Sequence, residues 1–147
     1  MKIIGCGHPD RGDDAAGPMV VQGLRDSGID ALSVTGEAFE LMEAWDSEDD
    51  VVVIDAVVTN APRGTIQIWN AASLAVPARG STSTHGLGLA EAIQLAHALG
   101  RLPKRLRVIG IEGREFSLGA DISREVEQSA RDVVRRITAG LFDETTS

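Results

Sequence analysis

Apolar residues follow two spacings along the chain, and each spacing predicts one kind of element. Continuous apolar runs, without the alternation of a half-exposed strand, predict strands buried on both faces. These runs lie at Lys2–Cys6, Val51–Ile54 and Val108–Ile111. Apolar residues at helical spacing predict helices at about Ala15–Asp26, Ala38–Trp45, Gly86–Leu99 and a last one capped by Asp121 or Ser123. Buried strands that alternate with helices are typical of a parallel sheet covered by helices, and we expect the Val51 strand to pair with the other two.

A different strand pattern appears at Thr65–Asn70, where apolar and polar residues alternate. Only the residues Ala56–Gly64 separate it from Asp55, whereas a parallel crossover needs about a dozen or more. We therefore expect this strand to be antiparallel to the Val51–Asp55 strand, as in a hairpin, and to lie near an edge. With a short strand at Ala31–Thr35, the sequence predicts an α/β fold with a mixed, mostly parallel, five-stranded sheet.

Composition narrows the class of protein. The chain has 147 residues and 43% hydrophobic residues, which predicts one globular domain over residues 1–147. Its formal net charge of -8, without a basic patch, argues against nucleic acid and anionic membranes as partners. No run approaches the ~20 apolar residues of a membrane span, and the apolar stretch at the N-terminus is too short for a signal peptide. The single cysteine, Cys6, excludes an internal disulfide and fits a cytoplasmic protein.

The first strand leads into a glycine-rich loop that ends in two adjacent acids, Asp13 and Asp14. We expect Asp13 to cap the following helix and Asp14 to lie near the positive end of its dipole. The glycine after Gly5 and Gly7 comes at Gly12, which breaks the spacing of a dinucleotide-binding loop. The loop therefore offers carboxylates to a cation instead of amides to a phosphate.

Three predicted connections carry candidate chemistry: Asp13 and Asp14 after the first strand, Asp55 at the end of the central strand, and His85 before a helix. Each residue alone is more often structural than functional. In an open sheet with right-handed crossovers, however, the carboxyl ends of the strands share one edge, where ligands bind. Carboxylates and an imidazole together suit a borderline divalent ion such as nickel or zinc.

At this point the chain resembles the hydrogenase maturation endopeptidases. Their opening pattern, Gly-x-Gly-Asn-x4-Asp-(Asp/Glu)-x-x-Gly, is similar to the segment that contains Gly5, Gly7, Asp13, Asp14 and Gly17. Three later segments also resemble that family, in the same order, as does the start of the last helix. They are Val51–Ala56, Thr84–Leu89 and Ile109–Glu112, followed by Asp121–Val126. The resemblance covers essentially the whole chain.

The resemblance implies a three-layer α/β/α sandwich with one antiparallel strand. It also implies a peptidase that removes the C-terminal extension from the large-subunit precursor of a nickel–iron hydrogenase, after nickel insertion. The metal-contacting and catalytic residues of the family match Asp14, Asp55 and His85. The nickel is expected to be carried by the precursor, and zinc or cadmium could substitute for it. We expect a cytoplasmic monomer that acts on this precursor.

Several questions stay open at the level of the sequence. The family's asparagine is His8 here, which is read as a surface substitution or as an additional ligand or proton carrier. For the reaction, a metal-held water, carboxylate general bases, or a metal that only docks the substrate are three routes. A thiol mechanism at Cys6 is the weaker alternative, since Cys6 ends a buried strand.

Two other classes of protein remain as alternatives. A magnesium-binding phosphoacceptor receiver domain also combines two early acids with an aspartate at the end of a central strand. Against it, no lysine closes the Val108–Ile111 strand, and the Thr65–Asn70 strand is foreign to receivers. The second alternative is a maturation factor that binds nickel without catalysis.

Overall fold

The computed structural model describes residues 1–47, 49–70 and 89–141. Its strands are β1 (Lys2–Cys6), β2 (Leu32–Val34), β3 (Asp50–Val57), β4 (Ile66–Asn70) and β5 (Arg105–Glu112). Its helices are the 3-10 helix η1 (Gly12–Ala15) and the α-helices α1 (Ala16–Asp26), α2 (Ala38–Glu43), α3 (Leu89–Ala98) and α4 (Arg124–Thr138). The elements predicted within these residues are present, with ends that differ by a few positions.

The strands form one sheet in the order β2-β1-β3-β5-β4. The first four are parallel, and β4 is antiparallel to β5 at one edge. The predicted mixed sheet, the edge position of β4 and the pairing of β3 with β1 and β5 are confirmed. The predicted hairpin is wrong, because β5 lies between β3 and β4. The burial of β3 explains this: its apolar residues occupy the sheet centre, whereas the half-exposed β4 fits at an edge.

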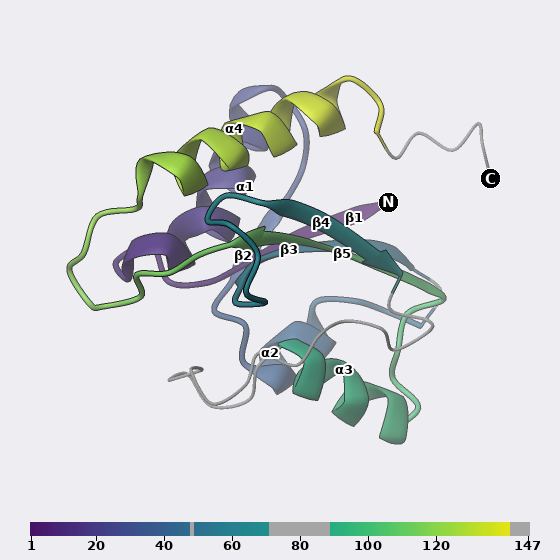
Figure 1. Cartoon of the computed structure of the whole chain (residues 1–147). Helices are drawn as coiled ribbons and strands as arrows, with labels where there is room; N and C mark the ends of the chain where they lie inside the picture. The colour runs from purple at the N-terminus through teal and green to yellow at the C-terminus, as the bar shows by residue number, and fades with distance from the viewer. Residues whose placement is uncertain (48, 71–88, 142–147) are drawn as a thin grey trace.

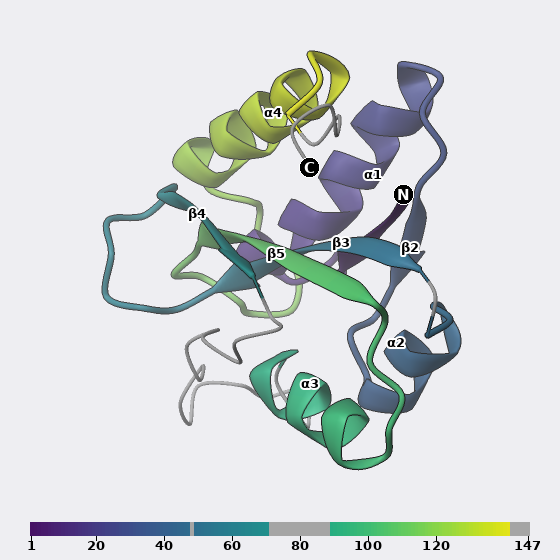
Figure 2. The same cartoon turned by 90° about the vertical axis from the view of Figure 1, so that its right-hand side faces the viewer.

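Helices cover both faces of the sheet, with α1 and α4 on one side and α2 and α3 on the other (Figure 1, Figure 2). Side chains alternate between the faces along β3: Val52 and Ile54 pack in the core under α1 and α4. Val51 and Val53 pack in the core over α2 and α3. This is the three-layer α/β/α arrangement that the resemblance implies, and it leaves the carboxyl ends of the strands accessible to connecting segments.

The start of α1 differs from the expected capping. Asp13 was expected to cap this helix, but Ala15 occupies the N-cap position and no side chain caps it. Asp13 lies instead inside η1, one short turn earlier. Its carboxylate is drawn away from the helix by amides of a distant segment, which offer it more hydrogen bonds than a single cap would. Pro18 falls in the first turn of α1, where its ring is tolerated.

Two glycines allow the opening loop to pack closely against the strands. Gly7 has a φ of 137°, and a Cβ there would lie 2.0 Å from the carbonyl oxygen of Asp14. A Cβ on Gly17 would lie 2.2 Å from the carbonyl oxygen of Cys6 and 2.9 Å from that of Ile54. The glycine spacing of the opening pattern therefore serves close backbone packing, which brings η1 onto the ends of β1 and β3.

Ser123 occupies the N-cap position of α4, so one of the two predicted caps is confirmed in position, although its side chain makes no capping hydrogen bond. The apolar stripe of this helix faces the core at Val126, Ala130, Val133 and Ile137. The predicted start of α3 near Gly86 lies outside the described residues. Among the described helices, none combines the length and the apolar character needed to cross a bilayer.

Candidate active site

Two of the three predicted site residues lie at the carboxyl ends of the central parallel strands. Asp55 belongs to β3, and Asp14 belongs to η1, which follows β1 and lies against β3. Both are buried, with exposed fractions of 2% for Asp14 and 5% for Asp55. The two carboxylates, about forty positions apart in the sequence, therefore belong to two elements that lie against each other, η1 and β3.

The Asp14 carboxylate is oriented by the loop that precedes it. Its Oδ2 accepts a hydrogen bond of 2.8 Å from the backbone N–H of His8. The backbone N–H of the half-buried His8 thus helps to hold the Asp14 carboxylate in place. The family pattern has Asn at this position, and Asn and His both have a backbone N–H that can do this.

Asp55 is placed by the pairing of its strand. It lies opposite Gly110 in β5 and directly after Ile54, which pairs with Gly5 of β1. Its position alternates with Ile54, so it shares the α2 and α3 face of the sheet with Val53. His85, the third predicted residue, lies outside the described residues, in the part of the sequence shortly before α3. Among the described residues, no group of three or more His, Cys, Asp or Glu side chains is arranged to hold a metal.

Asp13 points away from Asp14 and is fully buried. Its Oδ2 accepts the backbone N–H groups of Arg114 at 2.8 Å and Glu115 at 3.1 Å, and its Oδ1 accepts that of Ser123 at 2.8 Å. Burial by itself would raise the pKa of Asp13, but these amides outweigh it and hold the pKa below its ordinary value. Asp13 is therefore a buried, charged acceptor that joins η1 to the segment between β5 and α4.

Glu112 is a further buried acid, which the sequence did not identify as a candidate. It ends β5, and 1% of its surface is exposed. Its carboxylate accepts the backbone N–H and the hydroxyl of Thr59, the latter at 2.6 Å. It also forms an ion pair of 2.6 Å with Arg114. The motif Ile109–Glu112 marked the position, but the partners come from loops that no local pattern identifies.

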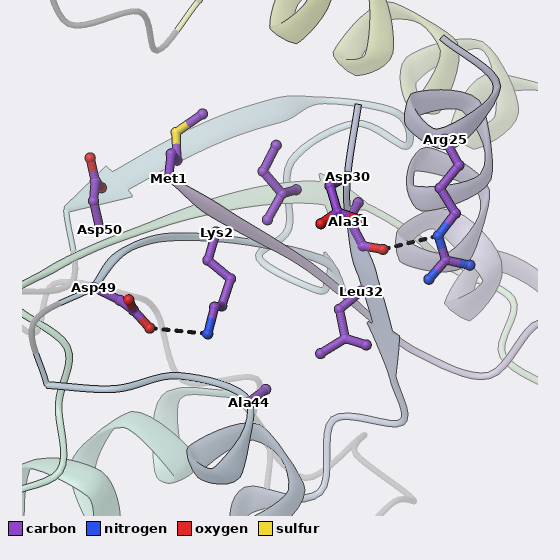
Figure 3. A pocket seen from close by; sticks show the side chains of 10 residues that line it. Met1, Lys2, Arg25, Asp30, Ala31, Leu32, Ala44, Asp49 and Asp50 are labelled. Carbon is purple, nitrogen blue, oxygen red and sulfur yellow. Dashed lines mark hydrogen bonds and ion pairs between the residues drawn. The ribbon is translucent and has the colours of Figure 1, made fainter. Parts of the chain in front are cut away.

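Among the described residues, neither the Cys6 thiol nor a hollow beside Met1 and Lys2 is assigned as a second site. Cys6 is 1% exposed and packs in the core over α2 and α3, where a thiol is poorly placed to attack a peptide. A hollow lined by Met1, Lys2, Asp30, Asp49 and neighbours lies at the opposite, amino end of β1 (Figure 3). Within it, Lys2 pairs with Asp49 at 3.1 Å, and Arg25 donates to the Ala31 carbonyl. We assign no ligand to it.

Comparison with known proteins identifies a family. A family model described as "HycI: Hydrogenase maturation protease" matches residues 32–140, which include Asp55 and His85. The hydrogenase 2 maturation protease of Escherichia coli K12 is 25% identical over 148 aligned residues, which cover 96% of this chain and 90% of the relative. Protein FrxA of Pyrococcus furiosus is 26% identical over 121 residues, covering 80% and 88%.

Solved structures show the same fold. The [NiFe] hydrogenase maturation protease HybD from Thermococcus kodakarensis has a TM-score of 0.70 and 26% identity, covering 96% of this chain and 99% of that one. The hydrogenase maturating endopeptidase HybD from E. coli has a TM-score of 0.73 and 22% identity, covering 96% and 92%. The family model spans residues 32–140, which is most of the chain. The chain therefore belongs to the hydrogenase maturation protease family and is an endopeptidase of that family.

Proposed function

We propose that this endopeptidase removes the C-terminal extension from the large-subunit precursor of a nickel–iron hydrogenase after nickel has been inserted. The family assignment supports peptidase action on a hydrogenase precursor. The observation that carries the finer proposal is the pair of buried carboxylates, Asp14 and Asp55, at the carboxyl edge of the sheet. In the proposal, the protein acts as a monomer in the cytoplasm.

The proposed roles follow from the chemistry of the three side chains. Asp14, Asp55 and His85 contact the nickel that the precursor carries, since two carboxylates and an imidazole suit a borderline divalent ion. The nickel is thus part of the substrate, and zinc or cadmium could take its place in a test of binding. Recognition of the metal would restrict cleavage to precursors that have already received it.

Cleavage adds one water across a peptide bond, so that a new carboxylate and a new amine form. A carboxylate in a nearly dry site can accept the proton of the attacking water as a general base. In the proposal, Asp14 or Asp55 takes this role; their burial and their position toward the carboxyl ends of the parallel strands support it. The nitrogen of the leaving peptide takes up a proton as the bond breaks.

The test is processing of a nickel-loaded precursor by the wild type and by Asp14→Ala, Asp55→Ala and His85→Ala. We expect each substitution to reduce the cleavage rate by at least about 100-fold, as for loss of a group that acts at the reacting centre. Asp26→Ala removes an exposed carboxylate at the end of α1 and is the matched control. Full processing by all three variants would refute the proposed site.

A nickel-binding factor without catalysis is the remaining alternative. The relatives are named proteases, which argues against it. The same assay separates the two: a noncatalytic factor would bind the loaded precursor and leave its length unchanged.

A further inference from the structure

The two adjacent acids of η1 face different partners. Asp14 accepts the backbone N–H of His8, in the loop directly after β1. Asp13 accepts amides from the segment after β5, about a hundred positions further along the sequence. The short 3-10 helix therefore lies between two connecting segments, and a carboxylate on each side holds it.

The contact through Asp13 has little freedom. Three backbone N–H groups, from Arg114, Glu115 and Ser123, donate to its carboxylate. In the opposite direction, the N–H of Asp13 donates to the Glu115 carbonyl at 2.7 Å, and that of Gly12 donates to the Ala120 carbonyl at 3.1 Å. Because η1 both accepts hydrogen bonds from this segment and donates hydrogen bonds to it, η1 cannot shift along the segment without breaking several of them at once.

The same segment is also attached to the connection that follows β3. The Arg114 guanidinium pairs with Glu112 and donates to the Ala61 carbonyl at 2.5 Å. Glu112 accepts both groups of Thr59. The segments after β1, β3 and β5 are therefore joined by one partly buried polar network, and Asp55 and Asp14 belong to two of the elements that it connects.

We propose that Asp13 is a positioning residue, which holds η1 so that the Asp14 carboxylate has a fixed place relative to Asp55. Asp13 itself does not touch substrate, because it is fully buried and its oxygens already accept three amides. The inference rests on the proposed function for its catalytic consequence. It does not depend on which of Asp14 and Asp55 accepts the proton.

Ser123 allows one of these hydrogen bonds to be removed without touching Asp13. Its φ is -70°, close to the value that a proline ring imposes, so Ser123→Pro deletes the N–H donor in a compatible backbone. Ser123→Ala keeps the N–H donor and removes only the hydroxyl, which also helps to lower the pKa of Asp13, so it isolates the share of the hydroxyl. Asp26→Ala, at the exposed end of α1, is the matched control. Asp13→Asn is the second variant. The NH2 group of Asn is a donor, so it would face the backbone N–H donors and could not accept their hydrogen bonds.

Two readouts report on Asp14. The first is kcat/KM for cleavage of the nickel-loaded precursor, corrected for the folded fraction. The second is the backbone amide resonance of His8, whose N–H contacts the Asp14 carboxylate directly. We expect Ser123→Pro and Asp13→Asn to lower kcat/KM by about 10- to 100-fold, since small misplacements are costly in catalysis. Both should shift the His8 resonance, and Ser123→Ala should have a smaller effect than Ser123→Pro. The control Asp26→Ala should stay within about twofold of the wild type and leave the resonance in place.

A residue that only stabilises the fold would lower the melting temperature without moving the His8 resonance or the corrected kcat/KM. That result, in a wild type that does cleave, would overturn the inference and leave the proposed function intact. Absence of cleavage by the wild type would refute the proposed function instead, and the His8 resonance in the variants would then decide the positioning role alone. If Ser123→Pro does not fold, Asp13→Asn provides the same comparison.

Discussion

At the scale of the residue, the partners of each buried acid determine its role. Asp14 and Asp55 lie toward the carboxyl ends of the parallel strands, where sheets of this kind bind ligands. Asp13 and Glu112 accept hydrogen bonds from amides and a hydroxyl, and Glu112 pairs with a guanidinium. All four are buried, so burial alone does not distinguish them. For Asp13, the backbone amides of Arg114, Ser123 and Glu115 hold the pKa of the carboxyl below its ordinary value despite burial.

Asp13 should make folding stability depend on pH. Burial raises its pKa and the amides of Arg114, Ser123 and Glu115 lower it by more, so the pKa of the folded protein lies below the unfolded one. The stabilisation is fully present above about pH 4 and is lost as the pH falls through the folded pKa. Chemical unfolding of the wild type and Asp13→Asn between pH 7 and pH 3 should show a gap in unfolding free energy that narrows below pH 4. A gap that widens there would contradict the assignment.

Arg114 should matter more for stability than a surface arginine. Arg114→Ala leaves Glu112 buried without its cation, although Thr59 still donates to it. We expect a loss of about 2 kcal/mol, discounted because the arginine is itself partly exposed. The control is Arg131→Ala, which breaks an exposed ion pair with Glu127 and should cost less than about 0.5 kcal/mol. Equal losses in urea unfolding would show that the Glu112 pair is no more than a surface contact.

The local sequence pattern predicted that Asp14 follows the first strand and that Asp55 lies at the end of a central strand. It could do so because the strand that carries or precedes each acid has a distinctive apolar run. It could not find the partners of Asp13. Those amides lie on residues separated from it by 101, 102 and 110 positions, and a backbone N–H leaves no trace in the residue type. The local sequence predicted that Asp13 caps α1, and the tertiary hydrogen bonds of Asp13 override that preference.

At the scale of the element, the close approach of α1 to the sheet sets the position of η1. Gly17 of α1 faces the backbone of β1 and β3, and Gly5 of β1 faces Gly17 in return. The order of the strands is likewise determined by packing between elements that are distant in the sequence. The direction of β4 could be predicted from the short connection before it, but its neighbour could not, because the pairing of β5 with β3 is a contact distant in sequence.

Two alanine substitutions in α1 should differ sharply. A Cβ at Gly17 would lie 2.2 Å from a backbone oxygen that cannot move alone, whereas a Cβ at Gly23 would meet a methyl group of Val134 at 2.8 Å. We expect Gly17→Ala to cost about 3 kcal/mol, at the upper end for overpacking. Gly23→Ala should stay within about 1 kcal/mol of the wild type, since better helix propensity offsets the rotation of Val134. Thermal or urea unfolding measures both, and similar losses would contradict the close approach at Gly17.

At the scale of the whole molecule, one sheet separates two apolar cores, and its carboxyl edge gathers the polar chemistry. Binary pattern predicted this architecture because continuous apolar strands require cover on both faces. The edge opposite the candidate site also carries charges around the hollow of Figure 3, among them the ion pairs of Lys2 with Asp49 and of Arg107 with Asp50.

The central claim is that this endopeptidase shortens a nickel-loaded hydrogenase precursor at its C-terminus. The most direct measurement is the intact mass of the large-subunit precursor from the same organism, before and after incubation with the purified protein, with and without nickel in the precursor. We predict that only the loaded precursor loses a C-terminal peptide and that the Asp14→Ala variant leaves it whole. An unchanged mass of the loaded precursor, with folded wild-type protein present, would contradict the account.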